Sequence, residues 1–355
     1  MTEPKLFSVL RIRDIELKNR IVVSPMCQYS AIDGHPQTWH LVHLGSRAVG
    51  GAGLVIAEAT AVEDIGRISA ADTGIYTDAH IDSWRPIVKF VREAGAVPGM
   101  QLAHAGRKGS TTAPWLGGKP VKISDGGWET VSPSAIPFED GQPVPRALTI
   151  PELDALIANF AAAARRALQA GFELLEIHAA HGYLLHEFLS PISNARSDDY
   201  GGSLENRMRL TLRVVAAIRK VWPARFPLFL RISATDWKEG GWDLEQSVAL
   251  ARAVKNEGVD LIDVSSGGTL PHAKIPIGPG YQVPFAEAIR KQAGIATGAL
   301  GMITEPAQAE TILADGQADL IVMAREFLRD PYWPRRAAKL MGVPLTPPVQ
   351  YGRAW

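Results

Sequence analysis

Short apolar runs alternate with longer amphipathic segments along most of the chain. Residues 150–171 and 244–258 repeat apolar positions with the period of a helix, and each of these segments ends in a glycine. The apolar runs are shorter and bounded by turn residues, which is typical of buried strands. Eight of them predict strands, in chain order at residues 21–26, 54–59, 97–102, 172–177, 228–233, 261–265, 294–298 and 319–324.

Eight strand–helix alternations favour a closed parallel barrel over a doubly wound open sheet, whose edge strands are usually shorter and more charged. We therefore predict the α/β class and a single (β/α)8 TIM barrel over residues 1–355. Residues 6–17 predict a hairpin that covers the bottom of the barrel. Residues 106–146, after the third strand, form a long connection with two tryptophans, and we expect an ordered cover over a pocket.

Composition narrows the class of protein. Lysine plus arginine number 37, as do aspartate plus glutamate, so neither a nucleic-acid partner nor a basic membrane surface is expected. The single cysteine, Cys27, excludes an internal disulfide and a cysteine-held iron–sulfur cluster. The first residues do not resemble a signal peptide, and no apolar run approaches membrane-spanning length. A cytoplasmic protein is expected.

Candidate chemistry gathers where the predicted strands end, the place where barrels collect catalytic groups. His178, His181 and Tyr183 follow the fourth strand. The two histidines could bind a metal, could be satisfied by backbone groups, or could clamp a carbonyl or nitro oxygen. We favour the clamp, because no third ligand pattern accompanies the pair. Tyr183, with an ordinary pKa of about 10, is then the candidate general acid.

Three further strand-end residues have open interpretations. Cys27 fits a nucleophile, a redox tuner beside a cofactor, or an inert buried thiol. Gln101 is either the partner of a heterocycle edge or a solvent-exposed loop amide. Arg231 interrupts an apolar strand, so its buried charge needs a carboxylate or an anionic ring, of which we favour the ring. Glycines after the seventh strand and Arg325 after the eighth predict a phosphate site.

Four motifs resemble the old yellow enzyme family over nearly the whole chain. They are S-P-M-C at 24–27, Q-L-A-H-A-G-R at 101–107, H-A-A-H-G-Y-L-L-H-E-F-L-S-P at 178–191 and N-A-R-S-D-D-Y-G-G-S-L-E-N-R at 194–207. Cys27 and the ending Tyr-Gly-Arg-Ala-Trp are similar to the thermophilic-like branch, which includes xenobiotic reductases. The resemblance implies FMN at the barrel mouth, reduced by NADPH or NADH. It further implies ping-pong transfer of hydride through flavin N5 to the C=C bond of an α,β-unsaturated carbonyl or nitro compound.

The same resemblance assigns residues to the site. The flavin would contact Ser24, Pro25, Met26, Cys27, Ala59, Gln101, Arg231, Gly301, Ala324 and Arg325. The substrate would contact Tyr29, His178, His181, Tyr183, Arg353 and Trp355. In that branch a C-terminal arginine reaches a neighbouring subunit, so the tail at 344–355 implies a homodimer or homotetramer. Ala324 stands where the family usually has glycine, and a glycine-only backbone angle there would be strained.

Three rival functions remain at the level of sequence. A metal-assisted hydrolase would use His178 and His181 as ligands. A flavin barrel of the 2,4-dienoyl-CoA reductase type carries an iron–sulfur segment that one cysteine cannot build. A non-catalytic barrel would bind flavin without turnover.

Overall fold

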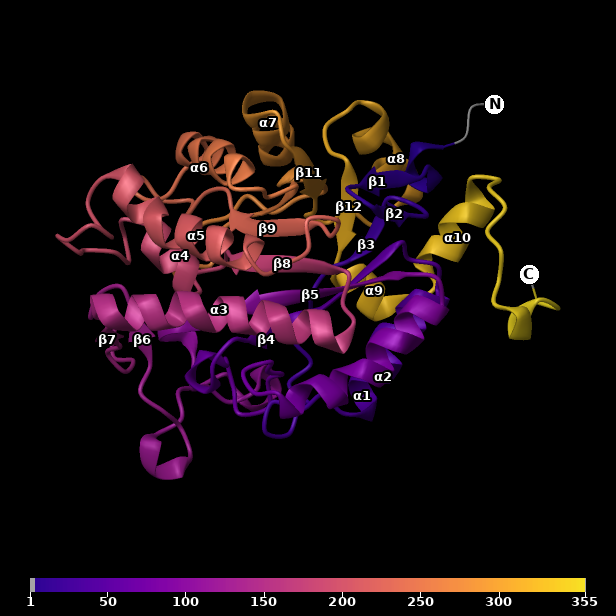
Figure 1. Cartoon of the computed structure of the whole chain (residues 1–355). Coiled ribbons are helices and arrows are strands. Elements are labelled where there is room, and N and C mark those ends of the chain that lie inside the picture. Colours follow the sequence, from indigo (N-terminus) through magenta and orange to yellow (C-terminus); the bar gives the residue numbers. More distant parts are fainter. Residues whose placement is uncertain (1–3, 355) are drawn as a thin grey trace.

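The computed structural model describes residues 4–354. Within them, parallel strands close into a barrel in which each strand pairs with the next along the chain and the last pairs with the first (Figure 1). The predicted (β/α)8 barrel is confirmed. Its strands are β3 (Ile21–Val23), β4 (Leu54–Ala61), β5 (Val97–Ala103), β8 (Leu174–Ala179), β9 (Leu228–Ser233), β10 (Leu261–Ser265), β11 (Ala296–Ala299) and β12 (Leu320–Met323).

Helices surround the barrel and pack their apolar faces onto the strands (Figure 1). The longest, α3, begins where Thr149 and Glu152 form a reciprocal capping box and ends at Gly171, which has a φ of 99°. The helices are α1 (Thr38–Val49), α2 (Ala79–Glu93), α3 (Ile150–Ala170), α4 (Leu184–Leu189), α5 (Leu204–Arg219), α6 (Leu244–Asn256), α7 (Val283–Ala293), α8 (Pro306–Ala314), α9 (Arg325–Arg329) and α10 (Trp333–Leu340).

A hairpin lies at the end of the barrel where the strands begin. Strands β1 (Leu10–Ile12) and β2 (Ile15–Leu17) pair antiparallel. Ile15 and Leu17 pack in one apolar cluster with residues that open the barrel strands, among them Leu54, Leu174 and Leu261. This apolar end of the barrel is called the bottom below.

The long connection, residues 106–146, is folded against the barrel. It contains three short 3-10 helices and strand β6 (Val131–Ser132), which pairs with β7 (Arg146–Ala147). Trp128 is anchored, because its Nε1 donates a hydrogen bond to the carbonyl of Ile65 at 2.9 Å. Trp115 is 66% exposed and contacts the ring of Tyr29 edge-on, with 5.6 Å between ring centroids. This connection is called the excursion below.

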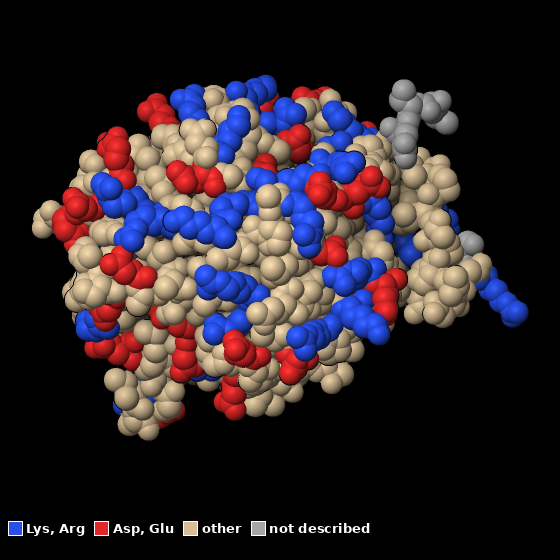
Figure 2. All heavy atoms as spheres, in the orientation of Figure 1, with Lys and Arg blue, Asp and Glu red and all other residues tan. Residues whose placement is uncertain are grey.

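The surface carries both signs of charge. Figure 2 shows lysine and arginine interspersed with aspartate and glutamate over the face drawn, which agrees with the balanced composition. No helix between residues 4 and 354 combines the length and apolarity that crossing a bilayer requires. Beyond α10, the C-terminal tail runs out from the body of the molecule (Figure 1).

Candidate active site

The candidate residues meet at the end of the barrel where the strands finish, which is called the mouth below. His178 on β8 and Arg231 on β9 are register partners on neighbouring strands. Arg231 is in turn the register partner of Asp263 on β10, and Gln101 on β5 is that of Glu176 on β8. Side chains from four adjacent strands therefore converge, although they are up to 162 residues apart in sequence.

Two clefts open at the mouth. The first, here the strand-end cleft, has a volume of about 380 Å³. It brings together six residues assigned above to flavin or substrate: Ser24, His181, Arg231, Gly301, Ala324 and Arg325. The second, here the excursion cleft, has a volume of about 470 Å³ and lies largely between excursion residues. Tyr29 and Tyr183 line it, together with Lys108 and Phe138.

A chain of polar side chains crosses the barrel beneath the strand-end cleft. Nη1 of Arg231 donates to Oγ of Ser24 at 2.9 Å, and its Nε lies 3.4 Å from Oδ2 of Asp263. Nε2 of Gln101 donates to Oε1 of Glu176 at 2.7 Å. Gln101 is buried, so the alternative of a solvent-exposed loop amide is wrong. Arg231 has the carboxylate partner that the sequence left open, and it also reaches the cleft.

Burial favours the protonated form of both carboxyl groups in this chain. Burial raises the pKa of Glu176 well above its ordinary value, and the neighbouring charge of Asp263 raises it further. Burial also raises the pKa of Asp263, against the opposing effect of Arg231. The guanidinium of Arg231 opposes this rise at both carboxyl groups, so it is the cation that favours their charged forms.

His178, His181 and Tyr183 form a cluster of three rings. The rings of His178 and His181 are nearly perpendicular, with centroids 5.1 Å apart, and the ring of Tyr183 is 5.0 Å from that of His178. Nδ1 of His178 accepts from the backbone N–H of Ala180, so its Nε2 carries the proton when the ring is neutral. Nε2 of His181 lies 2.7 Å from Oγ of Ser265.

Burial sets the protonation of this cluster. It lowers the pKa of both histidines well below the ordinary value, and the nearby charge of Arg231 lowers them further. Burial also raises the pKa of Tyr183, so the phenol stays protonated. Neutral imidazoles that each offer one N–H, beside a protonated phenol, can polarise an oxygen and donate a proton.

Cys27 lies just beyond β3 and is partly buried. Burial raises the pKa of its thiol, and the carboxyl groups of Asp72 and Glu58 raise it further. A thiolate is the nucleophilic form, so the protonated thiol argues against the nucleophile among the three open roles. Pro25 and Met26 precede it in the same partly exposed segment, and Ala59 lines a small void with Tyr183.

The backbone of Ala324 does not adopt the glycine-only angle that would have been strained. Its φ is −110°, outside the left-handed region, so its methyl group imposes no penalty of the glycine-only kind. Gly301 is the position in this cleft that needs glycine: its φ is 110°, and a Cβ there would lie 3.1 Å from Nε2 of Gln282.

Other expected residues lie elsewhere. Arg353 is exposed in the tail and does not line either cleft of its own chain, and Trp355 lies outside the described residues. No group of three histidine, cysteine, aspartate or glutamate side chains in residues 4–354 is placed to hold a metal ion. Within these residues, His178 and His181 therefore have no third side chain that would complete the metal site of a hydrolase.

Sequence reasoning missed several residues at the mouth. Nζ of Lys108 donates to the carbonyls of His181 and Gly268, at 2.9 and 3.1 Å, and lies 5.0 Å from the Tyr183 ring centroid. The position of Lys108 directly after the motif at 101–107 could have indicated that it lies at the site. Glu176 and Asp263 interrupt apolar strands as Arg231 does, so the argument applied to Arg231 would have found them.

Comparison with known proteins agrees with this geometry. An NADPH dehydrogenase of Geobacillus sp. (strain WCH70) is 51% identical over 355 residues, covering 99% of each chain. Among solved structures, morphinone reductase in complex with tetrahydroNAD has a TM-score of 0.79 at 28% identity, covering 98% of this chain and 93% of that chain.

The old yellow enzyme homologue of Zymomonas mobilis has a TM-score of 0.78 at 29% identity, covering 98% of this chain and 95% of that chain. The profile of the NADH:flavin oxidoreductase / NADH oxidase family matches residues 5–342. The chain therefore belongs to this family of FMN-dependent oxidoreductases, within the group of the old yellow enzymes.

Proposed function

We propose that the protein is an ene-reductase, which uses NAD(P)H to reduce the C=C bond of α,β-unsaturated carbonyl or nitro compounds. The observation that carries this proposal is the placement of His178 beside Arg231, with His181 and Tyr183 at the same mouth. A cation for an anionic ring, two N–H donors for an oxygen and a proton donor for carbon thus occupy one site.

The strand-end cleft suits FMN, the cofactor of the family. Arg231 lines this cleft, and although its Nε faces Asp263 at 3.4 Å, its guanidinium brings a positive charge to the place where an anionic ring would lie. Arg231 and Gln101 would hold the flavin ring, with Ser24 to Cys27 and Ala59 against it. Gly301, Ala324 and Arg325 would hold the phosphate.

FMN bound in this cleft would supply the hydride chemistry, from NAD(P)H to the β-carbon of the alkene. His178 and His181 bind the electron-withdrawing oxygen of the substrate and stabilise the negative charge that develops there. Nε2 of His178 lies 3.4 Å from Nδ1 of His181, and Nε2 of His181 lies against Ser265, so both donors must turn from these partners to the substrate. The hydroxyl of Tyr183 protonates the α-carbon, and Tyr29 closes the pocket above.

Nicotinamide and alkene would occupy this pocket in turn, which predicts ping-pong kinetics. A stopped-flow experiment tests the proposal. FMN-loaded protein is mixed with NADPH without oxygen, and the reduced protein is then mixed with 2-cyclohexen-1-one or, as control, cyclohexanone. We expect bleaching of the flavin by NADPH and recovery of its colour with the enone alone. Failure of the enone to restore the colour would reject the ene-reductase function.

Tyr183→Phe separates the two half-reactions. We expect reoxidation by the enone to slow by roughly 100-fold, the lower range for loss of a general acid, because the α-carbon loses its proton source. Bleaching by NADPH involves no such proton and should keep its rate. Tyr29→Phe is the matched control, since it removes a phenol from the same pocket. Equal slowing of both half-reactions would contradict the role of Tyr183.

We also propose that the active form is a cytoplasmic homodimer or homotetramer in which the tail reaches a neighbouring site. The exposure of Arg353 and the course of the tail away from its own barrel support this arrangement. A chain that ends at Gly352 should then bind substrate more weakly without losing FMN.

A further inference from the structure

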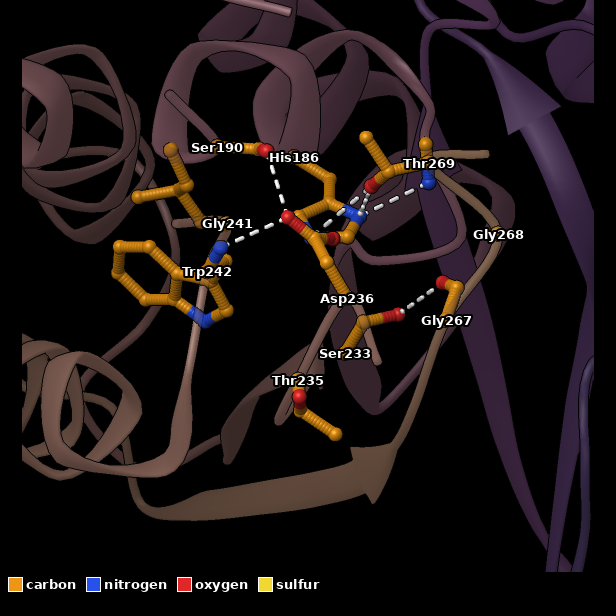
Figure 3. Close-up of polar contacts among 12 residues, drawn as sticks. His186, Ser190, Ser233, Thr235, Asp236, Gly241, Trp242, Gly267, Gly268 and Thr269 are labelled. Atoms are coloured by element: carbon orange, nitrogen blue, oxygen red, sulfur yellow. Dashed lines mark hydrogen bonds and ion pairs between the residues drawn. The ribbon is translucent and has the colours of Figure 1, made fainter. Parts of the chain in front are cut away.

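The third histidine of the same segment, His186, is buried beneath the mouth and has no part in the proposed chemistry. It lies on α4 beside Asp236, and neither side chain is exposed to solvent. Figure 3 shows the two side chains in contact, with Ser190, Thr269 and Trp242 around them. Nε2 of His186 lies 3.2 Å from Oδ1 of Asp236.

The other oxygen of Asp236 is fully used. Oδ2 accepts from Oγ of Ser190 at 2.6 Å and from the backbone N–H of Trp242 at 2.8 Å (Figure 3). Burial would raise the pKa of Asp236, but hydrogen bonds from His186, Ser190 and Thr269 lower it to about 2. Asp236 is therefore a fixed anion at neutral pH.

The opposite side of the His186 ring contacts the segment that carries the candidate catalytic groups. Nδ1 of His186 accepts the backbone N–H of Gly182 at 2.9 Å. A ring nitrogen that accepts a hydrogen bond carries no proton, so the proton of the neutral ring is on Nε2, facing Asp236. The carboxylate thus selects the form of His186 that can accept from Gly182.

Gly182 lies between His181 and Tyr183 in a turn that is costly to form. His181 has a φ of 59°, which is unfavourable for a residue with a side chain, and Gly182 has a φ of 71°. A Cβ at Gly182 would lie 2.2 Å from the carbonyl oxygen of Gly268, so the loop after β10 packs directly against this turn. Such a conformation persists only when surrounding contacts hold it.

From these contacts we infer that Asp236 and His186 are positioning residues, which hold the turn at His181 and Gly182 and thereby aim His181 and Tyr183 into the pocket. The effect on ligand binding rests on the proposed clamp, whereas the effect on the turn stands without it. Neither residue touches the reacting atoms. Their action passes through the backbone N–H of Gly182.

Asp236→Asn tests this inference with an almost isosteric change. The N–H of Trp242 can only donate, so it retains the amide oxygen of the new side chain, and the amide NH2 then faces His186. The imidazole must place its proton on Nδ1, where it opposes the N–H of Gly182. Ser190→Ala is the matched control, because it removes one hydrogen bond from the same carboxylate without changing the contact with His186.

Two measurements on FMN-loaded protein are needed: amide hydrogen exchange of residues 179–187, and the affinity for 4-hydroxybenzaldehyde from the change in the flavin spectrum. In Asp236→Asn we expect exchange to quicken and affinity to fall, each by about tenfold, the effect of an unsatisfied buried donor. Ser190→Ala should change neither by more than about twofold.

Unchanged exchange in Asp236→Asn, or equal changes in the two variants, would overturn the inference. Faster exchange in Asp236→Asn, with a wild-type protein that binds no phenol, would support the positioning role and reject the proposed clamp. If Asp236→Asn does not fold, His186→Asn and His186→Leu replace it, because only asparagine keeps an acceptor near the position of Nδ1. Slower amide exchange in His186→Asn than in His186→Leu supports the inference, and equal exchange in the two variants overturns it.

Discussion

The two ends of the barrel are built from the same strands but from opposite kinds of side chain. At the bottom, the strands begin with Leu54, Leu174 and Leu261, which pack against the hairpin in a cluster of apolar side chains. At the mouth, the same strands carry charged and amide groups, among them Glu176 and Arg231, and these are equally buried.

Because of this difference, the two ends of the barrel should respond differently to substitutions. An apolar layer depends on volume, so exchanges of similar size change its free energy little. A buried polar chain depends on each partner, because the removal of one group leaves a charge without compensation. The bottom of the barrel should therefore control stability alone, whereas the mouth should control stability, protonation and ligand binding together.

Arg231→Met should have the largest effect on the free energy of unfolding. It removes the cation of the buried ion pair between Arg231 and Asp263, and breaking such a pair costs about 3–5 kcal/mol. Urea unfolding of the FMN-free protein measures this loss. Arg231→Lys is the control that keeps the charge, and it should lose clearly less. A loss that is equal in both variants would show that the shape of the side chain, and not its charge, matters here.

Leu174→Ala tests the bottom of the barrel, which should affect stability alone. Loss of a fully buried leucine should lower the free energy of unfolding by about 2–5 kcal/mol through the cavity that remains. FMN affinity and both half-reaction rates should be unchanged, because the bottom of the barrel does not contact the clefts. Leu174→Ile, of similar volume, should cost less than about 1.5 kcal/mol. Reduced FMN affinity in either variant would show that the two ends are coupled.

His178→Asn tests whether the mouth makes the free energy of unfolding depend on pH. Burial, with Arg231 nearby, holds the pKa of His178 well below the ordinary 6.5 of the unfolded chain. Below pH 6.5 the unfolded state binds a proton that the folded state does not, so stability is complete above this pH and falls as pH decreases. Wild-type protein should lose about 1.4 kcal/mol per pH unit more than the variant. Urea titrations between pH 7 and 5 would show parallel slopes if His178 is not held neutral.

Cys27→Ala should produce the smallest effect. Replacement of a protonated, polarisable thiol at the proposed flavin site should shift the reduction potential by about 30 mV or less, which corresponds to about 1.4 kcal/mol for a two-electron couple. Spectroscopic redox titration measures the shift, with Cys27→Ser as the control that keeps a polar group. An unchanged potential would leave Cys27 as an inert buried thiol.

The sequence was sufficient to predict the barrel because its strands are buried on both faces and helices such as α3 carry capping residues at their ends. Thr149 and Gly171 mark α3 by local chemistry that needs no tertiary information. The ends of the strands also located His178, Tyr183, Gln101 and Arg231 at one mouth, since a parallel barrel brings all strand ends together.

Contacts between side chains of different strands and helices could not be predicted from the sequence. Which carboxylate meets Arg231 depends on the register of β9 against β10, and the contact between His186 and Asp236 depends on how α4 packs beneath the loop after β9. The backbone of Ala324 could not be inferred either, because a φ of −110° follows from the way β12 enters α9 and not from the residue type.

The excursion has a consequence for engineering. The proposed catalytic groups lie at the ends of barrel strands, whereas much of the wall of the excursion cleft belongs to one continuous segment, in which Ile123 and Trp115 are largely exposed. Grafting this segment between relatives should therefore exchange substrate preference as a module, and leave electron transfer to the barrel unaltered.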